Sequence, residues 1–151
     1  MSISTFEANL RSGEVERCSQ AVRDASDLGW PAAMIASAVL RDPGQPKRSR
    51  AWALQVLSLF QATHAEFVAS AAIAALRDSY AGVRANALAI LGTLRQADAV
   101  KAISALLSDT ETDPTALDER LTIADAAARA LQAIGTSEAL RELHKGKGRS
   151  A

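Results

Sequence analysis

Apolar residues recur along the chain at the spacing of an amphipathic helix. In one run they stand four, three, one and three positions apart, at Val83, Ala87, Ile90, Leu91 and Leu94. Side chains at this spacing share one face of a helix that has about 3.6 residues per turn. A half-buried strand would instead alternate apolar and polar residues, and the sequence shows no such alternation between turn signals. The pattern therefore predicts an all-α fold.

Turn signals set the limits of the predicted helices. Gly29-Trp30-Pro31 separates the first two long helices, and residues 42–46 (DPGQP) form a cluster of turn residues. Asp113 followed by Pro114 is typical of an N-cap and the first helical position, which places Leu117 on an apolar helix face. The predicted helices cover residues 3–11, 13–27, 31–41, 48–61, 65–77, 80–94, 97–108, 115–134 and 137–145.

Composition and internal repetition support this reading. The chain of 151 residues contains 33 alanines, the residue with the highest helix propensity. Segments of the sequence also match one another at offsets of similar length. Residues 50–57 match residues 84–91 at an offset of 34, with Arg, Ala, Leu and Leu in common, and residues 87–103 match residues 127–143 at an offset of 40. A repeat of this length accommodates two helices, which is the mark of a helical repeat protein.

The third repeat, residues 79–109, resembles a HEAT-like repeat of the kind found in phycobilisome lyase subunits and bacterial adaptor proteins. The matching features are Val83-Arg84, Ala87, Leu91-Gly92, Ala99-Val100 and the closing Asp109. The resemblance implies a right-handed α–α superhelix, an armadillo-like solenoid of about four antiparallel helix pairs. It also implies an ion pair between Arg84 and Asp78.

The implied solenoid is a single domain over residues 1–145 followed by a frayed tail at residues 146–151. Its repeats span approximately residues 1–42, 43–78, 79–109 and 110–145. In such a fold the second helices of the pairs line the concave face. Aligning the repeats on the second helix of the third one predicts which residues face outward there. The predicted partner-binding residues are Met34, Phe67, Ser70, Ile73, Lys101, Ser104 and Arg141.

The predicted concave face combines apolar side chains with a polar extension. Met34, Phe67 and Ile73 fall at positions that are polar in the third repeat. Exposed apolar patches on small proteins often mark partner sites. We therefore expect a non-enzymatic protein-interaction module, an adaptor or scaffold that binds a protein segment on this face. A lyase-like or chaperone subunit is an alternative that rests on the family resemblance alone.

A second alternative is nucleic-acid binding through one basic cluster. Its residues are Arg41, Lys47, Arg48 and Arg50. The chain as a whole has 17 Lys and Arg against 17 Asp and Glu, hence no net charge. Sequence-independent binding to nucleic acid draws on many Lys and Arg contacts to phosphates. The charge balance therefore favours a protein partner.

No constellation of residues suggests catalysis. His64 and His144 lack partners at metal-ligand spacing, and Cys18 lacks the basic neighbours that activate a thiol. The acidic segment 109–119 begins like a calcium-binding loop. It has Pro114 and Arg120 where that loop needs a glycine and a bidentate carboxylate. We expect no catalytic residue, no metal site and no cofactor, with Cys18 buried as a small apolar residue.

The sequence also shows no targeting or membrane-spanning segment. Its first residues show neither the basic nor the apolar region of a signal peptide, and no apolar run approaches the ~18 residues of a membrane span. We expect a cytoplasmic, monomeric protein without membrane contact.

Overall fold

The structure, a computed structural model, describes residues 1–149, with side chains described for residues 1–146. Every regular element of this part is a helix, and one isolated antiparallel bridge joins Thr112 to Thr122. The prediction of an all-α fold is confirmed. The chain divides into two compact units, Met1–Ala71 and Ala72–Ala151, and the division falls within α5 (Ala65–Ala75).

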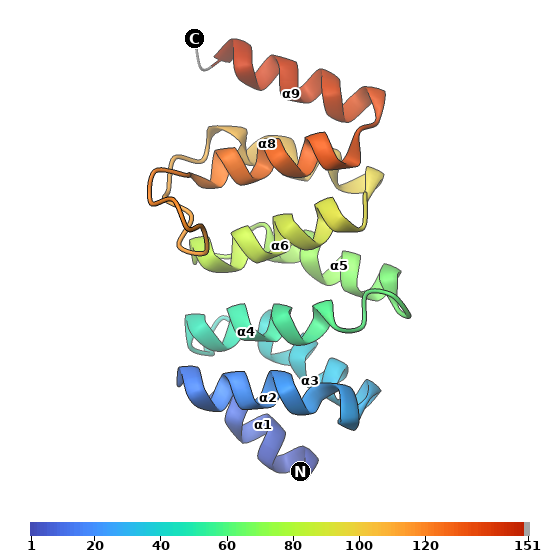
Figure 1. Ribbon diagram of the computed structural model, residues 1–151, viewed down its shortest axis with the longest axis vertical. Coiled ribbons are helices and arrows are strands. Elements are labelled where there is room, and N and C mark those ends of the chain that lie inside the picture. Colours follow the sequence, from blue (N-terminus) through green and yellow to red (C-terminus); the bar gives the residue numbers. More distant parts are fainter. Residues whose placement is uncertain (150–151) are drawn as a thin grey trace. The chain divides into compact units, whose positions relative to one another are not determined.

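The first unit is built from four complete helices and the start of α5. They are α1 (Ile3–Arg11), α2 (Val15–Leu28), α3 (Trp30–Arg41) and α4 (Lys47–Ser58). Helix α3 packs mainly on α4, and α1 packs on α2, in the lower part of Figure 1. The largest fully buried side chains of this unit are Phe6, Leu10, Val39, Leu54, Val56, Leu57 and Val68.

Glycine allows the sharp change of direction between α2 and α3. Gly29 has a φ of 68°, a backbone conformation that residues with a Cβ rarely adopt. Its amide closes α2 by donating to the carbonyl of Ala25, at 3.0 Å. Pro31 stands in the first turn of α3, where a missing amide hydrogen costs nothing. The chain therefore leaves one helix and enters the next with a single intervening residue.

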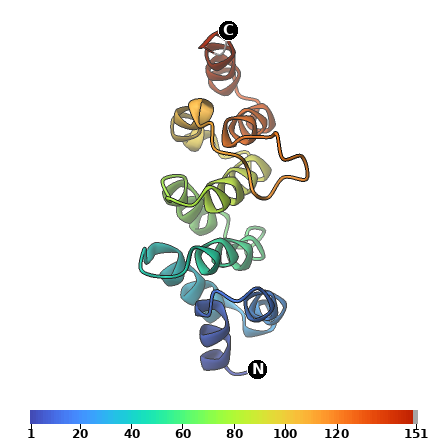
Figure 2. The same ribbon diagram turned by 90° about the vertical axis from the view of Figure 1, so that its left-hand side faces the viewer.

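The second unit contains the end of α5, three α-helices of ordinary length and a broken helix. The elements are α6 (Ala81–Thr93), η1 (Ala97–Ala99), α7 (Val100–Ser104), η2 (Ala105–Ser108), α8 (Ile123–Ile134) and α9 (Ser137–Arg149). Helix α8 packs against α6, α7 and α9, and the segment between η2 and α8 projects to one side of them in Figure 2. Fully buried side chains include Leu88, Leu91, Ile103, Ile123 and Leu131.

The structure corrects the predicted start of α8. This helix begins at Ile123 instead of residue 115, because Thr122 and Asp125 form a reciprocal capping box. Asp113 is not an N-cap: its carboxylate accepts hydrogen bonds from the amide and hydroxyl of Thr115 and closes a local turn. Leu117 consequently leaves the predicted apolar helix face and is fully exposed.

Two further boundaries differ from prediction. The single helix expected over residues 97–108 is divided into a short α-helix flanked by two 3₁₀ turns. The tail expected to fray from Gly146 continues α9 as far as Arg149, and residues 150 and 151 of that tail lie outside the described residues. Gly146 packs so closely that a Cβ there would stand 2.7 Å from the Leu107 side chain.

Candidate functional site

Aromatic side chains gather on the surface of the first unit. The indole of Trp30 stacks on the imidazole of His64, with ring centroids 4.3 Å apart and an interplanar angle of 26°. Phe67 meets the same indole edge-on, at 4.8 Å and 62°. Met34 follows Trp30 by one helical turn on α3, and the two residues are 49% and 38% exposed. We call Trp30, Met34, His64 and Phe67 the aromatic cluster.

Helix starts position the aromatic cluster. Trp30 is the first residue of α3 and is directed by the turn at Gly29. His64 immediately precedes α5: its carbonyl accepts the amide of Val68, and its Nδ1 shares a 2.9 Å hydrogen bond with the Thr63 hydroxyl. The start of α5 thus holds the backbone of His64, and the bond to Thr63 orients its imidazole.

The seven residues predicted for the concave face are divided between the two units. Met34, Phe67 and Ser70 belong to the first unit, and Ile73, Lys101, Ser104 and Arg141 belong to the second. Of these, Met34, Ser70, Lys101 and Arg141 are exposed, whereas Phe67, Ile73 and Ser104 are half-buried.

The aromatic cluster contains two residues that sequence reasoning missed. Repeat alignment indicated Met34 and Phe67, but the sequence places Trp30 in the turn before the helix predicted over residues 31–41, and His64 lies in a connector, where helical periodicity assigns no face. One signal was available for Trp30. It precedes Met34 by four residues, a spacing that puts both side chains on one face of a helix.

The predicted basic cluster loses one of its members. Arg50 is buried, with 7% of its surface exposed, and its Nη1 donates to the carbonyl of Gln45 at 2.6 Å. Arg41, Lys47 and Arg48 remain exposed. The basic surface is therefore smaller than the sequence indicated, because one of its four cationic side chains is buried and bonded to the backbone.

A carboxylate lies in the turn between those basic residues. Asp42 accepts hydrogen bonds from the Gln45 side chain at 3.0 Å and from the amide of Gly44 at 2.9 Å. These two bonds, with a smaller contribution from the charge of Arg11, lower the pKa of Asp42 below 3.8. Asp42 therefore remains negative at neutral pH and offsets part of the local positive charge.

The carboxylates of the acidic segment 109–119 are mostly engaged within the chain. Asp109 and Glu111 pair with Arg84, at 3.0 and 2.9 Å. Asp118 pairs with Arg120 at 3.1 Å, and the hydrogen bonds from Arg120 lower the pKa of Asp118 below 3.8. Most carboxylates of this segment are therefore already paired, and among the described residues Glu119 is the exposed one that makes no ion pair.

The predicted ion pair between Arg84 and Asp78 takes a different form. Nη1 of Arg84 donates to the backbone carbonyls of Asp78 and Ser79, at 2.9 and 3.1 Å, and the carboxylates that Arg84 pairs with are those of Asp109 and Glu111. Arg84 thus holds the turn before α6 through the backbone carbonyls of that turn.

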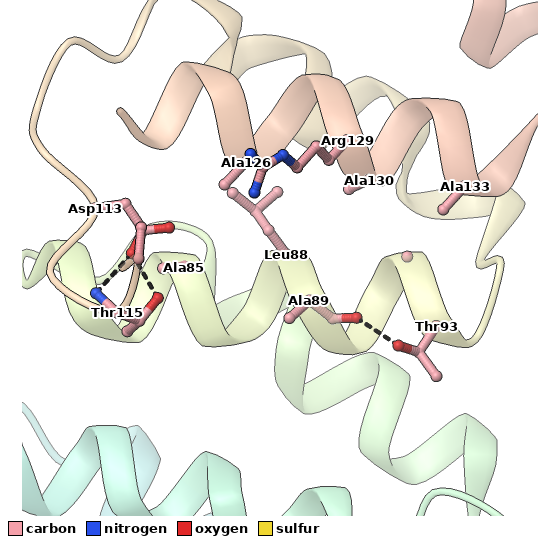
Figure 3. Close-up of a pocket in the computed structure, with 12 residues that line it drawn as sticks. Ala85, Leu88, Ala89, Thr93, Asp113, Thr115, Ala126, Arg129, Ala130 and Ala133 are labelled. Atoms are coloured by element: carbon pink, nitrogen blue, oxygen red, sulfur yellow. Dashed lines mark hydrogen bonds between the residues drawn. The ribbon is translucent and has the colours of Figure 1, made fainter. Parts of the chain in front are cut away.

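A groove runs between α6 and α8 in the second unit (Figure 3). Its volume is about 420 Å³, within the range of roughly 300–1,000 Å³ that is usual for ligand sites. The groove is lined by Ala85, Leu88, Ala89, Gly92, Thr93, Asp113, Thr115, Ala116, Ala126, Arg129, Ala130 and Ala133. Alanine and glycine dominate, so the walls of the groove carry little side-chain volume.

Cys18 and the two histidines take no part in a metal cluster. Cys18 is buried, as predicted, with its Sγ 3.5 Å from the carbonyl of Leu10. His64 and His144 are both exposed. Within residues 1–149, no three His, Cys, Asp or Glu side chains are grouped to hold a metal ion. None of the helices in this range is long and apolar enough to cross a bilayer.

Comparison with models of known protein families gave no match for this chain, and neither did comparison with curated proteins.

Proposed function

We propose that the protein is a non-enzymatic interaction module that binds a protein segment through the aromatic cluster on its first unit. The observation that carries the proposal is the exposure of Trp30 and Met34 beside Phe67 and His64. Trp, Phe and Met are enriched in the cores of protein interfaces, where large rings supply contact area at low entropic cost. Phe, Trp and Tyr make up only 4% of the chain, yet at this surface the Trp30 indole contacts both the Phe67 ring and the His64 imidazole.

The pre-set geometry of the rings favours binding. The stack between Trp30 and His64 is in place without a partner, so little side-chain freedom remains to be lost when a partner docks. The cluster supplies apolar surface together with the polar edges of an indole and an imidazole. A peptide segment with an apolar side chain and free backbone groups fits these properties.

We also propose that the chain is a HEAT-like repeat protein. The support is a repeated contact: Nη1 of Arg50 donates to the carbonyl of Gln45, and Nη1 of Arg84 donates to that of Ser79. Both pairs are separated by five residues, and each member of one pair lies 34 residues from its counterpart. This is the offset at which the two segments also match in sequence, as expected of equivalent positions in successive repeats.

The experiment is a capture of binding proteins from native lysate on immobilised protein, comparing Met34→Asp with the control Gln55→Asp. Met34 lies in the cluster, whereas Gln55 is an exposed residue of α4. The proposal requires a protein that the wild type and Gln55→Asp capture and that Met34→Asp loses. Both variants should keep the helical circular dichroism of the wild type, since both sites are exposed.

Equal capture by Met34→Asp and Gln55→Asp would contradict the proposed site. Salt-sensitive capture of nucleic acid, lost on neutralising Arg41, Lys47 and Arg48, would replace it with the basic surface.

A further inference from the structure

We propose that the groove between α6 and α8 receives Leu117 from a second copy of this chain, so that two molecules associate by exchanging this side chain. The proposal concerns the second unit alone and is independent of the aromatic cluster. It combines a projecting apolar side chain, an apolar recess and an unpaired charge on each.

The projecting side chain belongs to Leu117. It is the most exposed large apolar side chain of the described residues and lies in the segment between η2 and α8. Hydrogen bonds close this segment at its base, from the Asp113 amide to the Leu121 carbonyl at 2.8 Å and from the Ile123 amide to the Glu111 carbonyl at 2.8 Å. Leu117 is thus presented by a loop that is tied to its own unit, and exposing it costs hydrophobic free energy unless something covers it.

The recess is the groove itself. Leu88 of α6 lies at its centre, and small residues of both helices surround it: Ala85, Ala89, Gly92, Ala126, Ala130 and Ala133. Positions without side-chain volume beside a central leucine leave a space that suits a branched aliphatic group. The loop that carries Leu117 also lines one end of the groove, through Asp113, Thr115 and Ala116.

Charges on the two surfaces are complementary. Arg129 extends from α8 over the groove in Figure 3, and within residues 1–149 it makes no ion pair. Glu119 stands two residues after Leu117, is exposed, and likewise makes no ion pair in the part of the chain that the structure describes. A loop that places Leu117 in the groove brings Glu119 near its wall, where Arg129 can pair with it.

Leu117 does not fill the groove of its own molecule. Ala116 already lines the groove, and the fully exposed Leu117 follows it directly, pointing to solvent. A second copy solves this by symmetry: each loop enters the other molecule's groove about a twofold axis. Such an exchange forms each contact twice, Leu117 in the groove and Glu119 with Arg129, and it closes as a dimer instead of continuing as a filament.

The test is sedimentation equilibrium of the full chain at concentrations from micromolar to millimolar. The wild type should show a monomer–dimer equilibrium, and Leu117→Ser should raise the dimer dissociation constant by at least about tenfold, since one buried leucine is lost from each half. Leu140→Ser is the matched control, because it removes an exposed leucine from α9 of the same unit. Because the Leu117 side chain is fully exposed, the melting temperature of the dilute monomer should not change.

Charge exchange makes the test specific. Arg129→Glu and Glu119→Arg should each weaken the dimer, and the double variant should recover most of the lost affinity. A wild type that stays monomeric up to millimolar concentration overturns the proposal. So does a dimer whose dissociation constant is the same for Leu117→Ser as for Leu140→Ser, and so does a double variant weaker than both single ones.

Discussion

The guanidinium of Arg84 makes four hydrogen bonds within the described residues of the second unit, and its removal should destabilise that unit. Arg84 is 6% exposed. It donates to Asp109 at 3.0 Å, to Glu111 at 2.9 Å and to the carbonyls of Asp78 and Ser79 at 2.9 and 3.1 Å. In Arg84→Met the apolar chain is kept but all four bonds are lost.

The expected loss of unfolding free energy depends on how buried each carboxylate is once its bond to Arg84 is removed. The side chain of Asp109 is 15% exposed, so removing its partner strands a nearly buried carboxylate, and breaking such a pair costs about 3–5 kcal/mol. Glu111 is 62% exposed, so water replaces Arg84 there and the loss is below about 1 kcal/mol. We therefore expect Arg84→Met to lower the free energy of unfolding by about 3–5 kcal/mol, and Glu111→Gln by less than about 1 kcal/mol.

The assay is equilibrium urea unfolding followed by circular dichroism at 222 nm, with Glu111→Gln as the matched control. Arg84→Lys separates charge from geometry: an ammonium retains the charge but lacks the planar fork that reaches two carboxylates and two carbonyls at once. It should lie between the wild type and Arg84→Met. A loss below about 1 kcal/mol for Arg84→Met, or an equal loss for Glu111→Gln, would refute the view that the buried pair with Asp109 is what matters.

Four other predictions test local features. Ser49→Ala should raise the free energy of unfolding by about 1 kcal/mol in the same assay, since the fully buried Ser49 hydroxyl has no hydrogen-bond partner among the described residues. Gly92→Val should lower it by about 1–3 kcal/mol, because even a Cβ at this position would stand 3.3 Å from the backbone of α8. Thr122→Ala should lower it by about 1 kcal/mol by removing a capping box. In an NMR titration the pKa of Asp42 should lie below 3.8. Because folding lowers this pKa, the charged carboxylate stabilises the fold above pH 3.8, and this stabilisation is lost as the pH falls further. Gln45→Ala should return the pKa toward 3.8.

Most helices of the fold could be predicted because residues at their ends, such as glycine and proline, mark where a helix stops or starts. Gly29 with Pro31 marks the junction of α2 and α3, and the structure places it there. The start of α8 was predicted wrongly because Asp113-Pro114 suits an N-cap and a turn equally well. The capping box at Thr122 decided the start, together with the hydrogen bond from the Ala124 amide to the Asp109 carbonyl at 2.9 Å.

The candidate site was predictable only where periodicity applies. Repeat alignment singled out Met34 and Phe67, which the structure places in or beside the exposed cluster, but it says nothing of a ring in a connector such as His64. Charge alone was misleading at Arg50, since a sequence does not reveal whether a guanidinium faces water or a carbonyl. The offset of 34 to Arg84 was the signal that could have shown Arg50 to be structural.

The bond between Arg84 and Asp109 also bears on the order of folding. It joins residues 25 positions apart, while α6 forms from contacts within a few turns. Closing so long a segment costs chain entropy that only docked helices can offset. We expect the loop before α8 to be secured late, after the folding barrier is crossed. Substitutions at Asp109 should then leave the folding rate nearly unchanged and accelerate unfolding, so this bond governs how long the folded second unit persists.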